Sequence, residues 1–89
     1  MLRITRLAEL PPLITLKVEG RIQGDAVGLL ERECRDQIDG GRRVQLDFAD
    51  VAAIDRDGIA MLRELLSDQL EIVHAAPFLG ALLGQKEPL

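Results

Sequence analysis

The sequence has very little of what several common classes of function require. Among its 89 residues are two Phe, no Tyr and no Trp, so no row of aromatic rings is available to stack on single-stranded nucleic acid. The formal net charge of −4 and the pI of about 4.9 disfavour attraction to a phosphate backbone. One Cys excludes an internal disulfide, and one His leaves no His/Cys cluster for zinc. We therefore expect no nucleic-acid partner, no metal, no cofactor, and a reducing, cytoplasmic setting.

Long apolar runs and hydroxyl side chains are also scarce. No apolar run reaches the roughly 18 residues that a membrane-spanning helix needs, so we expect no membrane insertion. Arg3 and Arg6 stand where a signal peptide would have its apolar core. Thr5, Thr15 and Ser67 are the three hydroxyl side chains of the whole sequence. A Ser/Thr kinase therefore has few positions on which to act.

The patterns that are present predict a small α/β domain. Apolar and polar residues alternate over residues 2–5 and 13–19, which indicates two strands, the second ended by Gly20. The Pro11-Pro12 pair between them predicts a turn and antiparallel pairing. A third strand is expected over residues 43–48, and a weaker fourth over residues 70–74.

Helical spacing of apolar residues lies between these strands. The first helix is expected to start with Asp25 as its N-cap and to stop at Gly40-Gly41. A second is expected over about residues 57–68, and a short third over residues 78–83, with Pro77 in its first turn and Gly84 closing it. The order β-β-α-β-α-β-α predicts one domain over residues 1–84, with a mostly parallel four-stranded sheet, an antiparallel edge strand and about three helices. Residues 85–89 are expected to form a flexible tail.

The corner between the third strand and the second helix, residues 51–62, concentrates the unusual residues. In α/β sheets, function is usually presented at the carboxyl ends of the strands. One interpretation is structural: Asp55 or Asp57 caps the helix by accepting hydrogen bonds from its free N–H groups. Another is an acidic metal, ligand or phosphoacceptor site built from Asp47, Asp50, Asp55 and Asp57, although no lysine is expected nearby to hold a phosphoryl group.

Residues 44–62 resemble the signature of STAS domains, the anti-sigma-factor antagonists and their relatives in sulfate transporters, stressosomes and lipid-transport systems. In that signature an aliphatic strand leads into a loop that ends Asp-Ser-Ser/Thr-Gly-Leu, and a helix follows. The run here is Asp55-Arg56-Asp57-Gly58-Ile59. Residues 18–22 also resemble the strand-Gly-x-Leu/Ile element before the first helix of the family. The resemblance covers about residues 13–83.

The resemblance implies a bacterial signalling module that is not an enzyme and that binds a partner protein through the corner. The partner would be an anti-sigma-factor kinase or a subunit of a transport or signalling complex. The expected partner-binding residues are Asp25, Asp55, Arg56, Asp57, Gly58, Ala60 and Met61.

The phosphorylated position of the family falls on Asp57, and the neighbouring Ser position falls on Arg56. We therefore expect no phosphorylation of the motif by a Ser/Thr kinase. Two interpretations remain open. Asp57 is a phosphomimetic that holds the domain in its low-affinity state, or Asp57 is a cap and the partner has adapted to the acid and to Arg56.

Three further expectations concern single features. Cys34 lies on the apolar stripe of the first helix and is expected to be a small buried side chain rather than a reactive thiol. His74 is expected to be a structural or surface residue. The apolar residues of the last helix cannot all face one core, so that helix either packs in a groove with an exposed rim or supports a homodimer; they are Phe78, Leu79, Ala81, Leu82 and Leu83.

Overall fold

The structure is a computed structural model that describes residues 1–83, apart from the side chain of Phe78. It contains the four strands and three helices expected from the sequence, in the expected order. Their bounds are β1 (Leu2–Leu10), β2 (Leu13–Ile22), α1 (Asp25–Asp39), β3 (Arg43–Ile54), α2 (Arg56–Leu65), β4 (Leu70–Val73) and α3 (Pro77–Leu82). The sheet order is β1-β2-β3-β4, with β1 antiparallel to β2 and the other pairs parallel. The α/β fold class is confirmed, whereas the predicted Gly84 stop and the tail at residues 85–89 lie outside the described residues.

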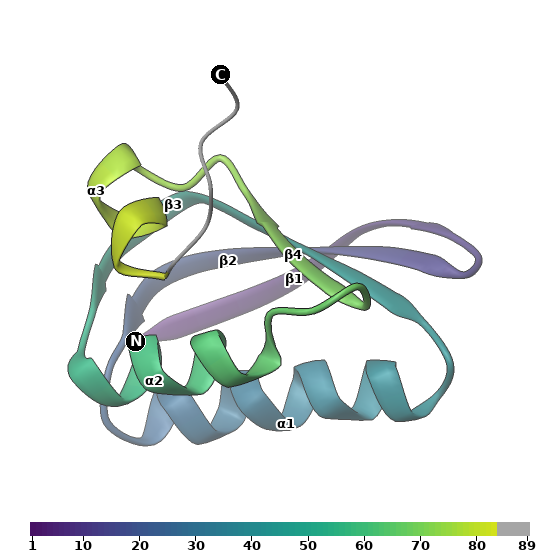
Figure 1. The fold of residues 1–89 in the computed structure, drawn as a ribbon, viewed down its shortest axis with the longest axis horizontal. Helices are drawn as coiled ribbons and strands as arrows, with labels where there is room; N and C mark the ends of the chain where they lie inside the picture. The colour runs from purple at the N-terminus through teal and green to yellow at the C-terminus, as the bar shows by residue number, and fades with distance from the viewer. Residues whose placement is uncertain (84–89) are drawn as a thin grey trace.

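Helices α1 and α2 run along the same side of the sheet, and α3 lies near the carboxyl end of β3 (Figure 1). Alternate residues of β2 and β3 face the two long helices and are buried, which explains the period-two pattern in the sequence. The main core side chains are Ile14, Leu16, Val18, Leu30, Cys34, Val44, Leu46, Phe48, Leu62 and Leu65. The intervening residues form a polar face, on which Thr15 Oγ1 donates to Gln45 Oε1 (3.2 Å) and Gln45 Nε2 donates to Glu71 Oε1 (3.0 Å).

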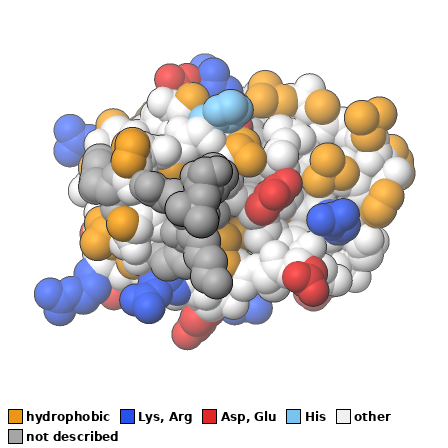
Figure 2. All heavy atoms as spheres, turned by 45° about the horizontal axis from the view of Figure 1, so that its top comes forward, with side chains coloured by type: hydrophobic (Ala, Val, Ile, Leu, Met, Phe, Trp, Pro, Cys, Tyr) orange, Lys and Arg blue, Asp and Glu red, His pale blue; other side chains and the backbone are white. Residues whose placement is uncertain are grey.

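The β1–β2 hairpin is longer than the sequence pattern indicates. β1 continues to Leu10, but both faces of its second half are exposed, so no alternation in the sequence marks this part of the strand. Leu7 is an extra residue of β1 that shifts the pairing with β2. Leu7 and Leu10 are exposed, and Figure 2 shows apolar side chains gathered at the right, where Figure 1 places the hairpin end. The prediction that Gly20 ends β2 is wrong. Gly20 lies within the strand at φ 101°, where a Cβ atom would collide with the carbonyl of Met1.

β3 is also longer than predicted, because it continues to Ile54 instead of ending at Phe48. Its pairing with β2 shifts twice, and each shift inserts one extra residue into β3. Such bulges bend a strand and change the directions of its side chains. Residues 49–54 are therefore a bent strand and not a loop, and β3 leads directly into the corner (Figure 1).

One end of each long helix differs from the prediction: the beginning of α1 and the end of α2. The N-cap of α1 is Gly24, which forms no side-chain cap hydrogen bond, and the predicted cap Asp25 is instead the first helical residue. The predicted stop at Gly40 is confirmed. α2 ends at Leu65 instead of residue 68, because Leu66 is extended and Ser67 forms a bridge with Leu70 that starts β4.

The last helix packs with one side inward. Leu79 in α3 and Leu83, the C-cap that follows it, are buried in the core, whereas Leu82 is 48% exposed. This agrees with a helix that packs in a groove and leaves an exposed rim. Self-association through α3 remains a prediction. Within residues 1–83, no helix is long and apolar enough to cross a membrane.

Candidate functional site

Asp55 connects the beginnings of the two long helices. It follows β3 directly and is the N-cap of α2, where its Oδ1 accepts a hydrogen bond from the backbone N–H of Gly58 at 2.8 Å. Its Oδ2 accepts from the backbone N–H of Gly24 at 3.0 Å, and Gly24 is the N-cap of α1. The backbone N–H of Asp55 donates to the carbonyl of Ile22 at 3.1 Å. The predicted aspartate cap is confirmed for Asp55, and its carboxylate also holds the β2–α1 loop.

The same hydrogen bonds set the charge state of Asp55. The backbone N–H of Gly58, and then that of Gly24, stabilise the carboxylate and lower the pKa of Asp55 below its usual value. Asp55 is therefore ionised at neutral pH. Because its two oxygens already accept from these backbone groups, its role in this structure is to position the corner.

Gly58 allows α2 to start close to the ends of β2 and β3. A Cβ atom at this position would lie 2.8 Å from Ile54 Cγ1 and 3.1 Å from both Cγ2 and the carbonyl oxygen of Ile22. These separations are too short for ordinary contacts, and the carbonyl oxygen belongs to the backbone of β2. Gly58 is thus required by the packing between the helix and the two strand ends.

The remaining predicted partner-binding residues divide into surface and core. Asp25, Arg56, Asp57 and Ala60 are exposed. Arg56 and Asp57 are the first two helical residues after the cap, where an acid also interacts favourably with the helix dipole. Within the described part of the chain, the side chains of Arg56 and Asp57 form no hydrogen bond or ion pair. Met61 is only 6% exposed and packs in the core, so it is not part of the surface in this structure.

We call the exposed set Asp25, Arg56, Asp57 and Ala60 the corner surface. Asp25 comes from the start of α1 and the other three come from the start of α2. The shared Asp55 carboxylate fixes these two helix ends relative to each other. Two carboxylates and one guanidinium with no partner in residues 1–83 are therefore available to another molecule.

The four aspartates proposed as a metal or phosphoacceptor site do not converge. Asp47 accepts a hydrogen bond from the backbone N–H of Ala49 at 2.9 Å, and Asp50 pairs with Lys17 Nζ at 2.8 Å. Lys17 lies close because β2 and β3 are neighbours, which corrects the expectation that no lysine is near these acids. The described residues contain no group of three or more His, Cys, Asp or Glu side chains that could hold a metal ion. The acidic-site interpretation is therefore without support from the geometry.

The two other reactive residue types are placed as expected. Cys34 is completely buried, and burial raises the pKa of its thiol to about 12, so it is a core side chain and not a nucleophile. His74 follows β4 and is exposed.

Sequence reasoning missed the role of Gly24, whose backbone N–H donates to Asp55 Oδ2. The only available indication was that the loops after two neighbouring parallel strands lie at the same edge of the sheet.

Comparison with known proteins finds solved structures that superpose on this chain, but no family model and no curated protein that matches it. Among solved structures, the anti-sigma factor antagonist SpoIIAA in its unphosphorylated form superposes with a TM-score of 0.73 at 11% identity, over 92% of this chain and 82% of that chain. A structure described as Mglu superposes with a TM-score of 0.62 at 22% identity, over 84% of this chain and 20% of that chain.

At these identities the similarity establishes the fold. The chain has a STAS-like fold, shared with SpoIIAA, and the expectation from the motif at the corner is confirmed at that level. The superposition covers 92% of this chain, whose mixed sheet has an antiparallel edge strand and is accompanied by three helices within residues 1–83.

Proposed function

We propose that this chain is a regulatory protein-binding module of the STAS type, without catalytic activity of its own, which binds a partner protein through the corner surface. The observation that carries the proposal is the double hydrogen bonding of Asp55. It holds the beginnings of α1 and α2 together, so that their exposed charged residues form one preorganised surface. Preorganisation reduces the entropy lost on binding. The fold shared with a protein described as an anti-sigma factor antagonist also supports this proposed function.

The charges on the corner surface indicate what kind of partner would fit. The guanidinium of Arg56 is exposed and suited to a bidentate interaction with a partner carboxylate. Asp25 and Asp57 would pair with cationic side chains of the same partner. The partner is accordingly a protein surface of mixed charge, such as an anti-sigma-factor kinase or a subunit of a transport or signalling complex, in the bacterial cytoplasm.

Regulation by phosphorylation of the motif is not part of this function, because Asp57 occupies the position of the switch hydroxyl. A carboxylate carries one charge and two oxygens, compared with a charge of about −1.5 to −2 and three acceptor oxygens for a phosphate. Asp57 is therefore an incomplete phosphomimetic. The adjacent Arg56 changes the surface a second time, which favours an interface adapted to both residues.

The phosphorylation part is tested by incubating the protein with its cognate anti-sigma-factor kinase and ATP, followed by mass spectrometry. We expect no phosphopeptide that covers residues 55–62, and detection of one would overturn the proposal. Binding of the same kinase to Asp57→Ser separates the two interpretations of Asp57. Tighter binding by this variant supports a phosphomimetic, whereas unchanged or weaker binding supports the adapted interface.

A further inference from the structure

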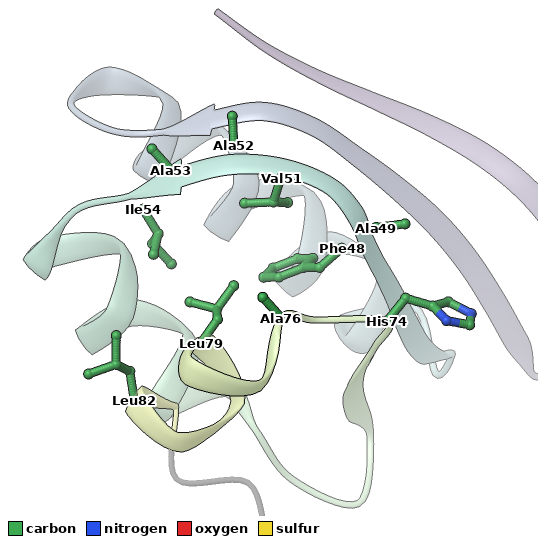
Figure 3. A pocket seen from close by; sticks show the side chains of 10 residues that line it. All are labelled: Phe48, Ala49, Val51, Ala52, Ala53, Ile54, His74, Ala76, Leu79 and Leu82. Carbon is green, nitrogen blue, oxygen red and sulfur yellow. The ribbon is translucent and has the colours of Figure 1, made fainter.

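A pocket of about 520 Å³ lies between the bent end of β3 and α3 (Figure 3). Phe48, Val51 and Ile54 point from β3 toward Leu79 of α3, and Ala76 lies between these walls. The side chains of Ala49, Ala52, Ala53 and His74 are turned away from this space, and Leu82 lies at its rim. The described residues that line the pocket are Phe48, Ala49, Val51, Ala52, Ala53, Ile54, His74, Ala76, Leu79 and Leu82.

The pocket follows from the irregular end of β3. In a regular strand Val51 and Ile54 would face opposite sides, because they are three residues apart. One extra residue of β3, Ala52, lies between them and directs both side chains toward α3. Opposite them, the methyl group of Ala76 is too small to fill the space. The pocket is partly open to solvent, so an apolar molecule of suitable shape that enters it would displace water and gain dispersion contacts with the apolar walls.

The chemistry of the walls defines what would bind. None of the ten described lining residues is Asp, Glu, Lys or Arg, and the imidazole of His74 points away from the pocket. Among these described residues, no charged side chain is therefore present to compensate the desolvation of a charged ligand. The volume lies within the range of about 300–1,000 Å³ that is usual for small-molecule sites.

The size of the described lining also favours a small molecule over a protein. A standard protein interface uses roughly 20–30 residues on each side, far more than the ten around this pocket. We propose that the pocket between β3 and α3 binds a small, neutral, apolar molecule. This proposal does not depend on the partner-binding function of the corner surface.

The pocket touches the corner through one side chain. Ile54 lines the pocket, and its Cγ1 lies 2.8 Å from the place where a Cβ on Gly58 would be. A ligand that contacts Ile54 would therefore lie next to Asp55 in the sequence and close to Gly58, whose backbone N–H binds the Asp55 carboxylate. The amide signal of Gly58 is expected to respond to binding, in addition to those of Val51 and Leu79.

Toluene, and octan-1-ol as a longer neutral probe, test the proposal in an NMR titration of the isotope-labelled full chain. We expect saturable shifts centred on Val51, Ile54 and Leu79 for at least one probe. Ala76→Leu fills the centre of the pocket and should weaken binding by about tenfold or more, whereas Ala81→Leu should leave it unchanged. Ala81 is a matched control because it is also exposed and lies in α3, but it is not among the residues that line the pocket.

Three outcomes would overturn the proposal. The shifts fail to saturate up to the solubility of both probes, they centre on Leu7 and Leu10 of the hairpin, or the two alanine variants bind equally. If Ala76→Leu does not fold, Leu82→Asp replaces it, because Leu82 is half-exposed at the rim and its carboxylate would disfavour an apolar ligand. Unchanged binding by Leu82→Asp would also overturn the proposal.

Discussion

Replacing Gly58 by alanine should destabilise the protein, although alanine is normally the better helix residue. The added methyl group would lie 2.8 Å from Ile54 Cγ1 and 3.1 Å from both Cγ2 and the carbonyl oxygen of Ile22. The two side-chain atoms can shift slightly, but the carbonyl belongs to the end of β2. Overpacking of this kind typically costs about 1–3 kcal/mol, whereas the helix propensity of alanine returns at most about 1 kcal/mol. The packing cost is the larger effect, so we expect a net loss of about 1 kcal/mol.

Gly28→Ala is the matched control for this substitution. Gly28 lies inside α1, and a Cβ atom there would meet nothing within 4 Å. This variant should therefore gain about 0.5–1 kcal/mol, because only the backbone effect of glycine is removed. For a domain of this size, 1 kcal/mol corresponds to a change of roughly 4–8 °C in Tm.

Urea unfolding and thermal melting, both followed by circular dichroism, measure the two variants. We expect Gly28→Ala to melt above the natural protein and Gly58→Ala to melt below it. If Gly58→Ala were as stable as Gly28→Ala, then α2 would not pack tightly on the strand ends. The argument that this glycine is required for packing would then be refuted.

Three further predictions concern Asp55 and Cys34. Asp55→Asn keeps one oxygen for Gly58 but its amide nitrogen cannot accept from Gly24, so hydrogen exchange of the Gly24 amide should accelerate while the helix cap survives; unchanged exchange would contradict the double role of Asp55. Because the folded pKa of Asp55 is lowered, its stabilisation is complete above an unfolded pKa of about 3.9 and is lost as the pH falls through the lower folded value. Urea unfolding at a series of acidic pH values should show that Asp55→Ala lacks this part of the pH dependence, and identical profiles would argue against it. Iodoacetamide should modify Cys34 slowly in the folded state and rapidly in urea, since burial raises the pKa of this thiol to about 12; rapid modification of the folded protein would contradict its burial.

The regular parts of the fold were predictable from the sequence because one face of each central strand is buried. Alternation marks β2 and the first half of β3, and helical spacing marks α1 and α2. The second half of β3 was missed, since two bulges break its period, and the second of them places Val51 and Ile54 on one side. The second half of β1 was missed because its exposed residues carry no pattern. The extension of β3 and the pocket below it therefore have a common origin.

The candidate site was predictable only in its local part. Asp55 as a cap follows from residues close in sequence, since its Oδ1 bonds Gly58 three positions later. Its second bond joins Gly24, 31 positions earlier, and depends on the parallel pairing of β2 with β3. The burial of Met61 could not be separated from the exposure of Ala60 either, because which of two neighbouring apolar residues faces inward depends on the packed position of α2.

The central claim is that a partner protein binds the corner surface without help from a phosphorylated hydroxyl. Isothermal titration of a purified partner, such as the cognate anti-sigma-factor kinase, into Arg56→Ala and Arg63→Ala tests it directly. Both arginines are exposed and both belong to α2, but Arg63 lies in the last turn, away from the corner. We expect Arg56→Ala to weaken binding by about tenfold or more, because a lost charged hydrogen bond costs roughly 1.5–3 kcal/mol, and Arg63→Ala to bind as the natural protein does. Equal affinity of the two variants would contradict the claim.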